Sequence, residues 1–283
     1  MPKMRRIKFA AGFLLLAALV IWASVLAFPT KNLKIITCNV GQGDAILTVY
    51  GNLQILTDGG PGNRVLACLS RHMPFWDRKI ELVILTHPEI DHYEGLIEVF
   101  KRYHVDKFLT TKLESSTLAY RVLKNVVGSS SASILTPKEG MNIRSGLIQI
   151  EILHPAEVFL SKGINKPNEI SCVYELKFKE FKALFTGDIP PKVINELLKN
   201  GLIGEVDYIK IPHHGSKNGA TPELIRTTKP KVASISVGER NSYGHPDQEV
   251  LEILKEEGVK TLRTDEMGDI ELETDGQKFW INH

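Results

Sequence analysis

The chain has 283 residues and a formal net charge of +2, with 43% hydrophobic and 24% charged residues. At roughly 100 to 200 residues per domain, this length fits one large globular domain or two small ones. The composition excludes a disordered chain, a collagen-like repeat and a small disulfide-stapled scaffold.

The net charge is unevenly distributed along the chain. Six of the 35 basic residues lie in residues 1–34, which contain no acidic residue; the rest therefore has 29 basic against 33 acidic side chains, a net charge of −4. A mildly acidic body argues against a protein that coats nucleic-acid phosphates through a generally basic surface. Local basic patches are compatible with these totals.

The N-terminal segment is strongly apolar. Residues 1–8 are basic, and the twenty residues 9–28 contain no charge and only one polar side chain, Ser24. At about 1.5 Å per residue, a helix over this stretch crosses a hydrocarbon core of about 30 Å. The basic flank predicts a cytoplasmic N-terminus and an exported body. We expect a membrane anchor at 9–28; a secreted chain after signal-peptide cleavage at Val25-Leu26-Ala27 is the alternative, and a buried core helix is disfavoured because the segment lacks a polar face.

Short apolar segments then alternate with helical patterns. Three strands separated by glycine-containing turns are predicted at 33–37, 45–49 and 53–57. A short helix at 64–71, a buried strand at 82–86, a helix at 95–103, a strand at 107–110 and a helix at 117–127 follow.

The second half of the chain has a similar pattern. Strands are predicted at 147–153, 171–178, 183–186, 208–211, 232–237, 260–263, 269–273 and 278–281, and helices at 192–199, 222–227 and 248–257. No linker rich in Ser, Pro or Gly divides the chain. We therefore expect one domain over 33–283, made of two similar βαβ-containing halves with sheets inside and helices outside.

The three cysteines predict no chemistry. Cys38, Cys68 and Cys172 are widely spaced and form no CxxC pair. Because Cys38 and Cys172 lie within apolar strand-like segments, we interpret them as small buried hydrophobic residues, not as a disulfide framework.

The densest group of metal-competent residues follows the strand at 82–86. His87, Glu89, Asp91 and His92 lie within six residues, at the carboxyl end of a strand, where α/β folds place their ligands. This spacing can send the first pair to one metal ion and the second pair to a neighbour about 3.5 to 4 Å away. A solvated polar loop is the alternative interpretation.

Three later polar segments also follow predicted strands. Asp188, in a TGD sequence, either bridges two cations or caps the next helix. His213 and His214 lie in a PHHGS sequence after the strand at 208–211. His245 lies in the polar loop 238–246 and is either a site residue or an ordinary loop histidine.

Together these motifs resemble those of the metallo-β-lactamase fold. Their order is HxExDH from His87, TGD ending at Asp188, PHHGS and YGHP, preceded by NVGQGDA at 39–45 and DGG at 58–60. More narrowly, residues 33–282 are similar to the hydrolase domain at the C-terminus of ComEC family DNA-uptake proteins. The resemblance implies an α/β fold of four layers, an αββα sandwich, with a binuclear metal site between the two halves.

The resemblance also implies roles for the site residues. Two divalent ions, Zn²⁺ or Mn²⁺, would be held by a set of side chains that comprises His87, Glu89, Asp91, His92, Asp188 and one or both of His213 and His214. Asp91 would also accept a proton from the attacking water, and His245 would donate one to the leaving oxygen. Ser216, Lys217, Asn218 and Asn241 are expected to hold a phosphate, although Lys217 also fits a solvated loop lysine.

The chain departs from the family pattern at several positions. Glu89 stands where relatives at large have His and ComEC-type members have Asp, and a carboxylate there favours an oxygen-preferring ion such as Mn²⁺. The His motif that usually precedes TGD is not evident, since His154 lies far upstream and Asn168 with Ser171 occupies the equivalent stretch. We therefore expect one ion to be weakly held or absent. Asn39 replaces an Asp that is common in the family before VGQGD. We expect this residue to contact the metal ligands and not the metal ions.

These expectations lead to a functional hypothesis. The exported, membrane-anchored domain would hydrolyse phosphodiesters through a metal-bound hydroxide, with single-stranded DNA as the favoured substrate in a competence-like role. With one hydrophobic span, the chain cannot conduct DNA alone, so uptake requires a separate channel protein. The alternatives are hydrolysis of cell-envelope or small phosphodiesters, and a non-catalytic, metal-depleted module that docks to a channel. The joint presence of Asp91, His92 and Asp188 favours catalysis.

Overall fold

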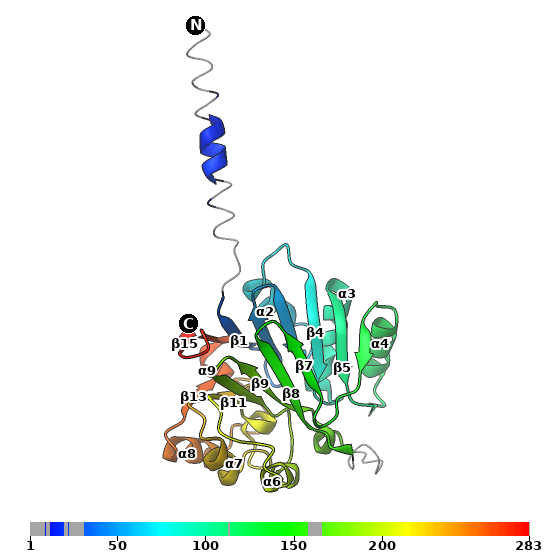
Figure 1. Ribbon diagram of the computed structural model, residues 1–283. Helices are drawn as coiled ribbons and strands as arrows, with labels where there is room; N and C mark the ends of the chain where they lie inside the picture. Colours follow the sequence, from blue (N-terminus) through cyan, green and yellow to red (C-terminus); the bar gives the residue numbers. More distant parts are fainter. Residues whose placement is uncertain are drawn as a thin grey trace.

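The computed structural model describes residues 9, 12–19, 22, 31–112, 114–157 and 166–282 (Figure 1). Half of the membrane anchor predicted at 9–28 lies outside the described residues. Within the described part of the chain, no helix is both long and apolar enough to cross a bilayer.

Two β-sheets form the centre of the domain. The first contains β1 (Leu33–Thr37), β2 (Ile46–Tyr50), β3 (Leu53–Thr57), β4 (Lys79–Leu85), β5 (His104–Thr110), β6 (Ser133–Leu135), β14 (Ile270–Thr274) and β15 (Phe279–Asn282). The second contains β7 (Asn142–Ser145), β8 (Ile148–His154), β9 (Val173–Phe178), β10 (Phe181–Phe185), β11 (Tyr208–Lys210), β12 (Val232–Ile235) and β13 (Lys260–Arg263). The strand orders are β15-β14-β1-β2-β3-β4-β5-β6 and β13-β12-β11-β10-β9-β8-β7.

Amphipathic helices cover the outer faces of both sheets (Figure 1). The first sheet carries α2 (Val65–His72), α3 (Ile90–Arg102) and α4 (Leu118–Gly128), and the second carries α6 (Pro191–Lys199), α7 (Pro222–Thr228) and α8 (Gln248–Glu256). Helix α3, for example, buries Tyr93, Leu96, Val99 and Phe100 at helical spacing. The shorter elements are α9 (Thr264–Met267) and the 3₁₀ helices η1 (Pro167–Ile170) and η2 (Pro212–Gly215).

Three apolar layers separate these elements. One lies between the two sheets, where the rings of Tyr174 and Phe185 stack with centroids 4.6 Å apart. The other two lie between each sheet and its helices. This arrangement confirms the predicted αββα sandwich.

The first sheet is not built from one continuous stretch of the chain. Two halves that follow each other in sequence would have been the simplest arrangement of the predicted domain. Strand β14 pairs antiparallel with β1, with Thr274 opposite Leu33, so the last two strands complete the first sheet. Both were predicted as strands, at 269–273 and 278–281, but the sequence did not indicate which sheet they join. Strands β6 and β7 were missed because they are short and mostly exposed.

The strand directions place the predicted site residues together. Strands β1, β3, β4 and β5 run in one direction, since β2 pairs antiparallel with β1 and β3, and β3, β4 and β5 pair in parallel. In the second sheet β10, β11, β12 and β13 are parallel. The carboxyl ends of these strands carry the motifs that start at residues 38, 58, 86, 186 and 212, so these motifs meet at one end of the sandwich.

A disulfide joins Cys38, just after β1, to Cys68 on α2. The interpretation of Cys38 as a simple buried hydrophobic residue, and of the cysteines as chemically silent, was therefore wrong. A separation of 30 residues forms no local motif, so only the fold reveals the pair. Cys172 is a free buried cysteine, as predicted, and burial raises the pKa of its thiol.

Removal of this disulfide should destabilise the domain. A crosslink that closes a loop of 30 residues contributes about 3 to 4 kcal/mol through the entropy of the unfolded chain. Urea unfolding of the full chain should show a loss of that order after reduction. The Cys38→Ser/Cys68→Ser variant should be insensitive to reductant, whereas Cys172→Ser should respond like the wild type; an equal midpoint with and without reductant in the wild type would refute the crosslink.

Candidate metal centre

The loops at the site end are tied to one another by buried hydrogen bonds. The carboxylate of Asp58 accepts bonds of 2.8 Å from both the backbone nitrogen and the Oγ1 of Thr86. The backbone nitrogens of Asp44 and Gly59 donate to the carbonyls of Asp91 (3.1 Å) and His92 (2.7 Å). The segments after β1, β3 and β4 therefore form one rigid unit around the histidines.

Three buried histidines point one ring nitrogen each into this unit. On the other side of each ring, Nδ1 of His92 donates to Asp58 (2.9 Å), Nδ1 of His214 donates to the carbonyl of Ser236 (2.9 Å), and Nδ1 of His87 lies 3.0 Å from Thr86 Oγ1. With Nδ1 as the donor, each Nε2 carries a lone pair. In the described structure, none of the three Nε2 atoms has a hydrogen-bond partner.

Two carboxylates face these nitrogens. Asp188 Oδ2 lies 3.4 Å from Nε2 of both His92 and His214, and Asp91 Oδ2 lies 3.4 Å from Nε2 of His214. The potential ligand atoms of His87, His92 and Asp188 lie within 4.8 Å of one another, as do those of Asp91, His92 and His214. The two groups share His92, and the helix cap that was the alternative for Asp188 is Pro190 instead.

This donor set fits divalent metal ions. A buried polar nitrogen without a partner costs free energy, and three that converge on carboxylates indicate a ligand that satisfies them together. Imidazole and carboxylate ligands suit Zn²⁺ and Mn²⁺. Glu89 lies at the edge of the cluster, with Oε2 3.9 Å from Nε2 of His87.

The electrostatics of the cluster also favour the binding of positive charge. Burial opposes ionisation of His92, but Asp188 and Asp58 raise its pKa well above the usual value, and burial of His214 is likewise outweighed by Asp188 and Asp44, which raise its pKa to about 9. Burial would raise the pKa of Asp188, yet His214, His92 and Lys210 hold it well below the usual value. Metal ions would supply the charge that these imidazoles otherwise acquire with protons.

Lys210 and Asp44 lie next to the cluster, and neither was predicted to be a site residue. Lys210 is almost fully buried on β11; its Nζ pairs with the carboxylate of Asp44 and lies 3.4 Å from Asp188 Oδ1. The lysine thus occupies one oxygen of Asp188 and leaves the other facing the histidines. A lysine within the apolar strand YIKI was the signal that could have identified it, because lone buried charges are rare.

Near the ligands, the backbone is left-handed at Gly187, His213 and His214 among other positions. Gly187 has a φ of +52°, and a Cβ there would lie 2.1 Å from Ser171 Oγ, so only glycine fits before Asp188. His213 and His214 have φ values of 53° and 55°, a conformation that costs energy for non-glycine residues. This turn buries His214 within the cluster and leaves His213 half-buried outside the ligand groups found among the described residues.

A cavity of about 640 Å³ opens onto the cluster. No Lys or Arg is among its described lining residues, which are Gln42, Pro88, Glu89, Ile90, Asp91, Glu114, Ser115, Ser116, Thr117, Pro167, Asp188, His213, His214, Tyr243 and His245. The ring of Tyr243 stacks on that of His245, with centroids 5.9 Å apart. His245 lies in the wall of this cavity.

The four residues expected to hold a phosphate lie outside the described wall of this cavity. The side-chain amide of Asn241 bonds to the backbone of His245 through both ends, at 2.7 and 2.9 Å, so it orders the loop. Ser216 is buried and accepts a bond from the backbone nitrogen of Asn218 (3.2 Å), while Lys217 is exposed.

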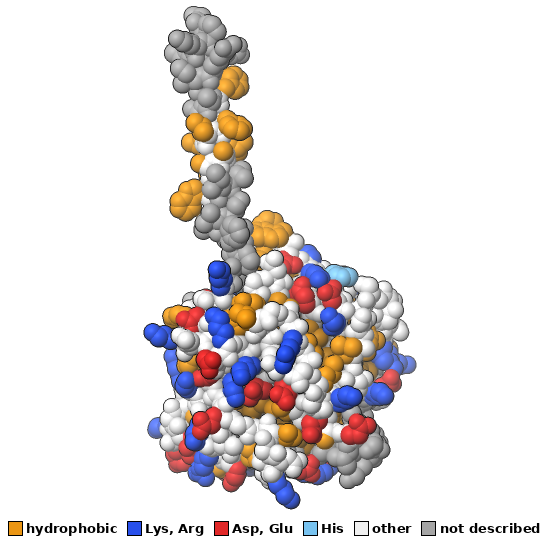
Figure 2. Space-filling view, viewed as in Figure 1, with side chains coloured by type: hydrophobic (Ala, Val, Ile, Leu, Met, Phe, Trp, Pro, Cys, Tyr) orange, Lys and Arg blue, Asp and Glu red, His pale blue; other side chains and the backbone are white. Residues whose placement is uncertain are grey.

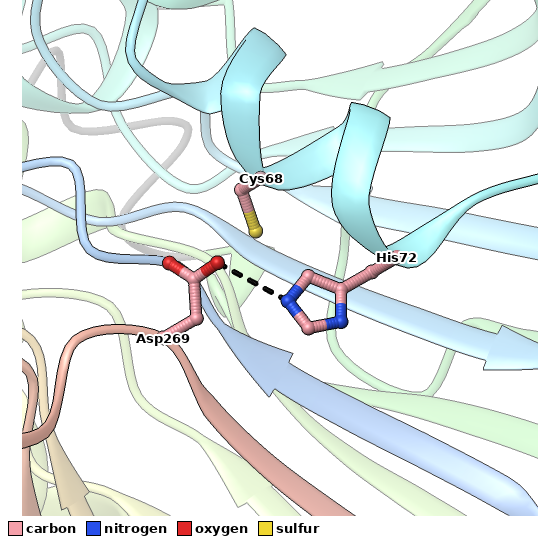
Figure 3. Close-up of side chains that lie close together, drawn as sticks. All are labelled: Cys68, His72 and Asp269. Carbon is pink, nitrogen blue, oxygen red and sulfur yellow. Dashed lines mark hydrogen bonds and ion pairs between the residues drawn. The ribbon is translucent and has the colours of Figure 1, made fainter. Parts of the chain in front are cut away.

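A second cluster of ligand-type residues lies away from the cavity, between α2 and β14 (Figure 3). Its sulfur belongs to Cys68, which is bonded to Cys38, so no thiolate is available there. His72 instead lies 3.1 Å from Asp269 and 3.2 Å from Glu271. Hydrogen bonds to these two carboxylates raise the pKa of His72 to about 9. The cluster is an ion-pair network that holds α2 to the closing strand.

The sandwich and the position of its buried cluster define the metallo-β-lactamase fold. The metallo-β-lactamase fold protein YhfI from Bacillus subtilis superposes with a TM-score of 0.53 at 12% identity, covering 81% of this chain and 95% of its own. A diphosphatase of the PhnP family gives a TM-score of 0.52 at 15% identity, with coverages of 85% and 98%. CmlA, a diiron β-hydroxylase from Streptomyces venezuelae, gives 0.55 at 16% identity, with coverages of 87% and 55%. Identities this low establish the fold alone.

Among curated proteins, the chain is similar to proteins of DNA competence and recombination. It is 28% identical to ComE operon protein 3 of Bacillus subtilis over 195 residues, which is 69% of this chain and 24% of that protein. It is 28% identical to Recombination protein 2 of Haemophilus influenzae over 247 residues, 86% of this chain and 29% of that protein. The chain thus spans less than a third of these relatives, and no protein-family model matches it. The resemblance predicted from the motifs is confirmed.

The different environments of His213 and His214 predict different effects on metal content. His214→Ala removes one of the three converging nitrogens, so the bound metal should fall by at least one ion per chain or its affinity should fall at least about tenfold. His213→Ala should retain the wild-type content because its ring lies outside the ligand groups. Elemental analysis after equilibrium dialysis against Mn²⁺ or Zn²⁺ measures both; the reverse order of effects would contradict the assignment.

The His72 network predicts how stability depends on pH. Because its folded pKa of about 9 lies above its usual value, its contribution is complete below pH about 6.5 and is lost as the pH rises through 9. His72→Gln should lower the free energy of unfolding by about 1 to 2 kcal/mol at pH 6 and by little at pH 10. The exposed His104→Gln is the matched control in urea unfolding; equal losses at both pH values would contradict the ion pairs.

Proposed function

We propose that this domain is a metal-dependent hydrolase of phosphodiesters and that its substrate is DNA. The observation that carries the proposal is the convergence of three buried imidazole nitrogens, none with a hydrogen-bond partner, on Asp188 and Asp91 beside an open cavity. A merely structural histidine cluster would pair these nitrogens internally and would not need a cavity 640 Å³ in volume.

The described residues would have different roles in such a site. His87, His92, His214, Asp188 and Asp91 would hold the ions, with Glu89 at the rim. Bound there, divalent ions would polarise the phosphoryl oxygens and neutralise the charge that develops on them. Asp58 and the Ser236 carbonyl hold the rings of His92 and His214 in orientation, and Lys210 fixes Asp188 from behind.

Asp91 and His245 are the proposed proton carriers. Burial would raise the pKa of Asp91, but His92 and His214 lower it below the usual value, so its partly exposed carboxylate is ionised and can accept a proton from water. The pKa of His245 is lowered, chiefly by burial, which keeps the ring neutral. A phosphodiester anion beside His245 raises this pKa and so favours protonation of the ring. The proton can then pass to the leaving oxygen.

The charge of the cavity makes phosphate binding depend on the metal ions. Glu89, Asp91, Glu114 and Asp188 line it, and no Lys or Arg does among the described residues. Without cations this wall repels a phosphodiester, whereas bound ions reverse its sign. The names of two relatives, Recombination protein 2 and Competence protein ComA, support DNA as the substrate.

We further propose that residues 9–28 anchor the domain to the cell membrane with the site outside the cytoplasm. A role in DNA uptake then requires a separate channel protein, and this part of the proposal rests on relatives of which the chain covers less than a third. A small or cell-envelope phosphodiester is the second candidate substrate. The lack of Lys and Arg in the described lining of the cavity favours it, because proteins usually bind long polyanions through Lys and Arg.

Cleavage assays test the function directly. The full chain in detergent, dialysed against Mn²⁺ or Zn²⁺, should hydrolyse bis(p-nitrophenyl) phosphate and labelled single-stranded DNA. Asp188→Ala and His92→Ala should lower kcat/KM at least about a hundredfold. Asp106→Ala, at the opposite end of β5, is the matched control and should keep wild-type activity. Absence of cleavage with either ion, or unchanged cleavage in the site variants, would refute the hydrolase; cleavage of the small ester without DNA would select the second candidate.

A further inference from the structure

The end of the domain opposite the metal centre is formed by the connections that precede the parallel strands. Leu33 lies opposite Tyr50 and Thr274, and Lys79 lies beside His104. A Cβ on Gly146 would lie 3.7 Å from the ring of Tyr50, and Lys179 donates to the carbonyl of Asp275. We call one part of this end the base of the domain; it comprises residues 31–33, 50–53, 73–79, 102–104, 145–148, 178–181 and 274–279, and the connections before β11, β12 and β13 lie at the same end but outside it.

Large apolar side chains protrude from the base. Phe75 and Trp76, in the connection between α2 and β4, are 80% and 59% exposed, and Leu147 in the β7–β8 turn is 52% exposed. The rings of Phe75 and Trp76 contact each other edge-on, with centroids 4.8 Å apart. The α2–β4 connection lies at the same end as the start of β1 (Figure 1), and hydrophobic side chains protrude at that end in Figure 2. Exposed apolar groups concentrated in this way indicate a binding surface.

The charge of the base differs from that of the rest of the body. Six basic side chains lie within it against three acidic ones, although the chain beyond residue 34 is acidic overall; the basic residues are Lys31, Arg78, Lys79, Arg102, Lys179 and Lys278, and the acidic ones are Asp77, Glu180 and Asp275. Lys79 and Arg102 pair with carboxylates in the neighbouring strands and helix. A tryptophan and phenylalanine surrounded by an excess of Lys and Arg is the chemistry that suits the headgroup region of an anionic bilayer.

The sequence places the base close to the apolar segment. Phe28 ends that segment five positions before Leu33, a distance that an extended chain spans with at most about 18 Å. If residues 9–28 lie in the bilayer, as proposed above, the base is the part of the domain nearest to the lipid. The strands then stand between the membrane and the metal centre.

We propose that the base docks on the lipid bilayer, with Phe75 and Trp76 among the headgroups, and that the metal centre faces away from the membrane. The seven residues of β4 span about 23 Å, so the cavity opens well clear of the lipid surface. A polymeric substrate can then reach the site from the aqueous side. This inference depends on the proposed anchor but not on hydrolytic activity.

Tryptophan quenching tests the docking. The full chain is reconstituted into vesicles that contain brominated phosphatidylcholine and phosphatidylglycerol. Trp22→Phe/Trp280→Phe leaves Trp76 as the single tryptophan, and its fluorescence should fall at least about twofold relative to unbrominated vesicles. The matched control combines Trp22→Phe, Trp76→Phe and Trp280→Phe with Tyr243→Trp at the exposed rim of the cavity, and it should not be quenched.

A third variant separates docking from anchoring. Trp76→Phe/Trp280→Phe leaves Trp22 as a reporter of the apolar segment. Quenched Trp22 with unquenched Trp76 overturns the docking and leaves the anchor intact, whereas unquenched Trp22 with unquenched Trp76 overturns both. Quenching of the rim control to the same extent as Trp76 also overturns the proposed orientation. An emission change of Trp76 with a protein partner but not with lipid assigns the base to that partner and refutes lipid docking.

Discussion

The rest of the site depends on the interactions of the buried carboxylate of Asp188. One of its oxygens lies 3.4 Å from two imidazole nitrogens, and the other lies 3.4 Å from the ammonium of Lys210. A fully buried carboxylate is stable only with such partners, because its desolvation costs several kcal/mol. Lys210 and Asp44 form a buried pair behind it. The charges are thus arranged so that the remaining negative potential is directed at the cavity.

The fold supplies this arrangement from both of its sheets. Asp188 and Lys210 come from the second sheet, whereas His92, Asp58 and Asp44 follow strands of the first. The His87, His92 and Asp188 group and the Asp91, His92 and His214 group each combine residues from both sheets, so the apolar layer between the sheets determines how far apart these ligands lie. Tyr174 and Tyr208 within that layer donate to or accept from Thr57 (2.7 Å) and Thr37 (3.1 Å) across the interface, which fixes the register of one sheet on the other.

Much of this architecture could be predicted from the sequence because periodicity and motif spacing are local properties. Strands 33–37 and 53–57 were predicted to the residue, and His87, Asp91, His92 and Asp188 do come together. The disulfide, the choice between His213 and His214, and the role of Lys210 could not be predicted in this way. Each depends on which distant segments pack together or on a left-handed backbone turn, and neither is encoded in a short window. The bonds that the side-chain amide of Asn241 makes within its own loop could not be predicted for the same reason.

The pairing of β14 with β1 has a consequence for biogenesis. Leu33 and Thr274 are 241 positions apart, so the first sheet has an open edge until nearly the whole polypeptide has emerged. The backbone nitrogen of Asn39 also bonds to Asp269 (2.8 Å), which ties the loop that carries Asp44 to this late segment. A contact of such high sequence separation forms slowly and late. If the domain is exported, as proposed above, the chain passes through an export channel before its ligand set is assembled, and the site becomes competent only on the far side.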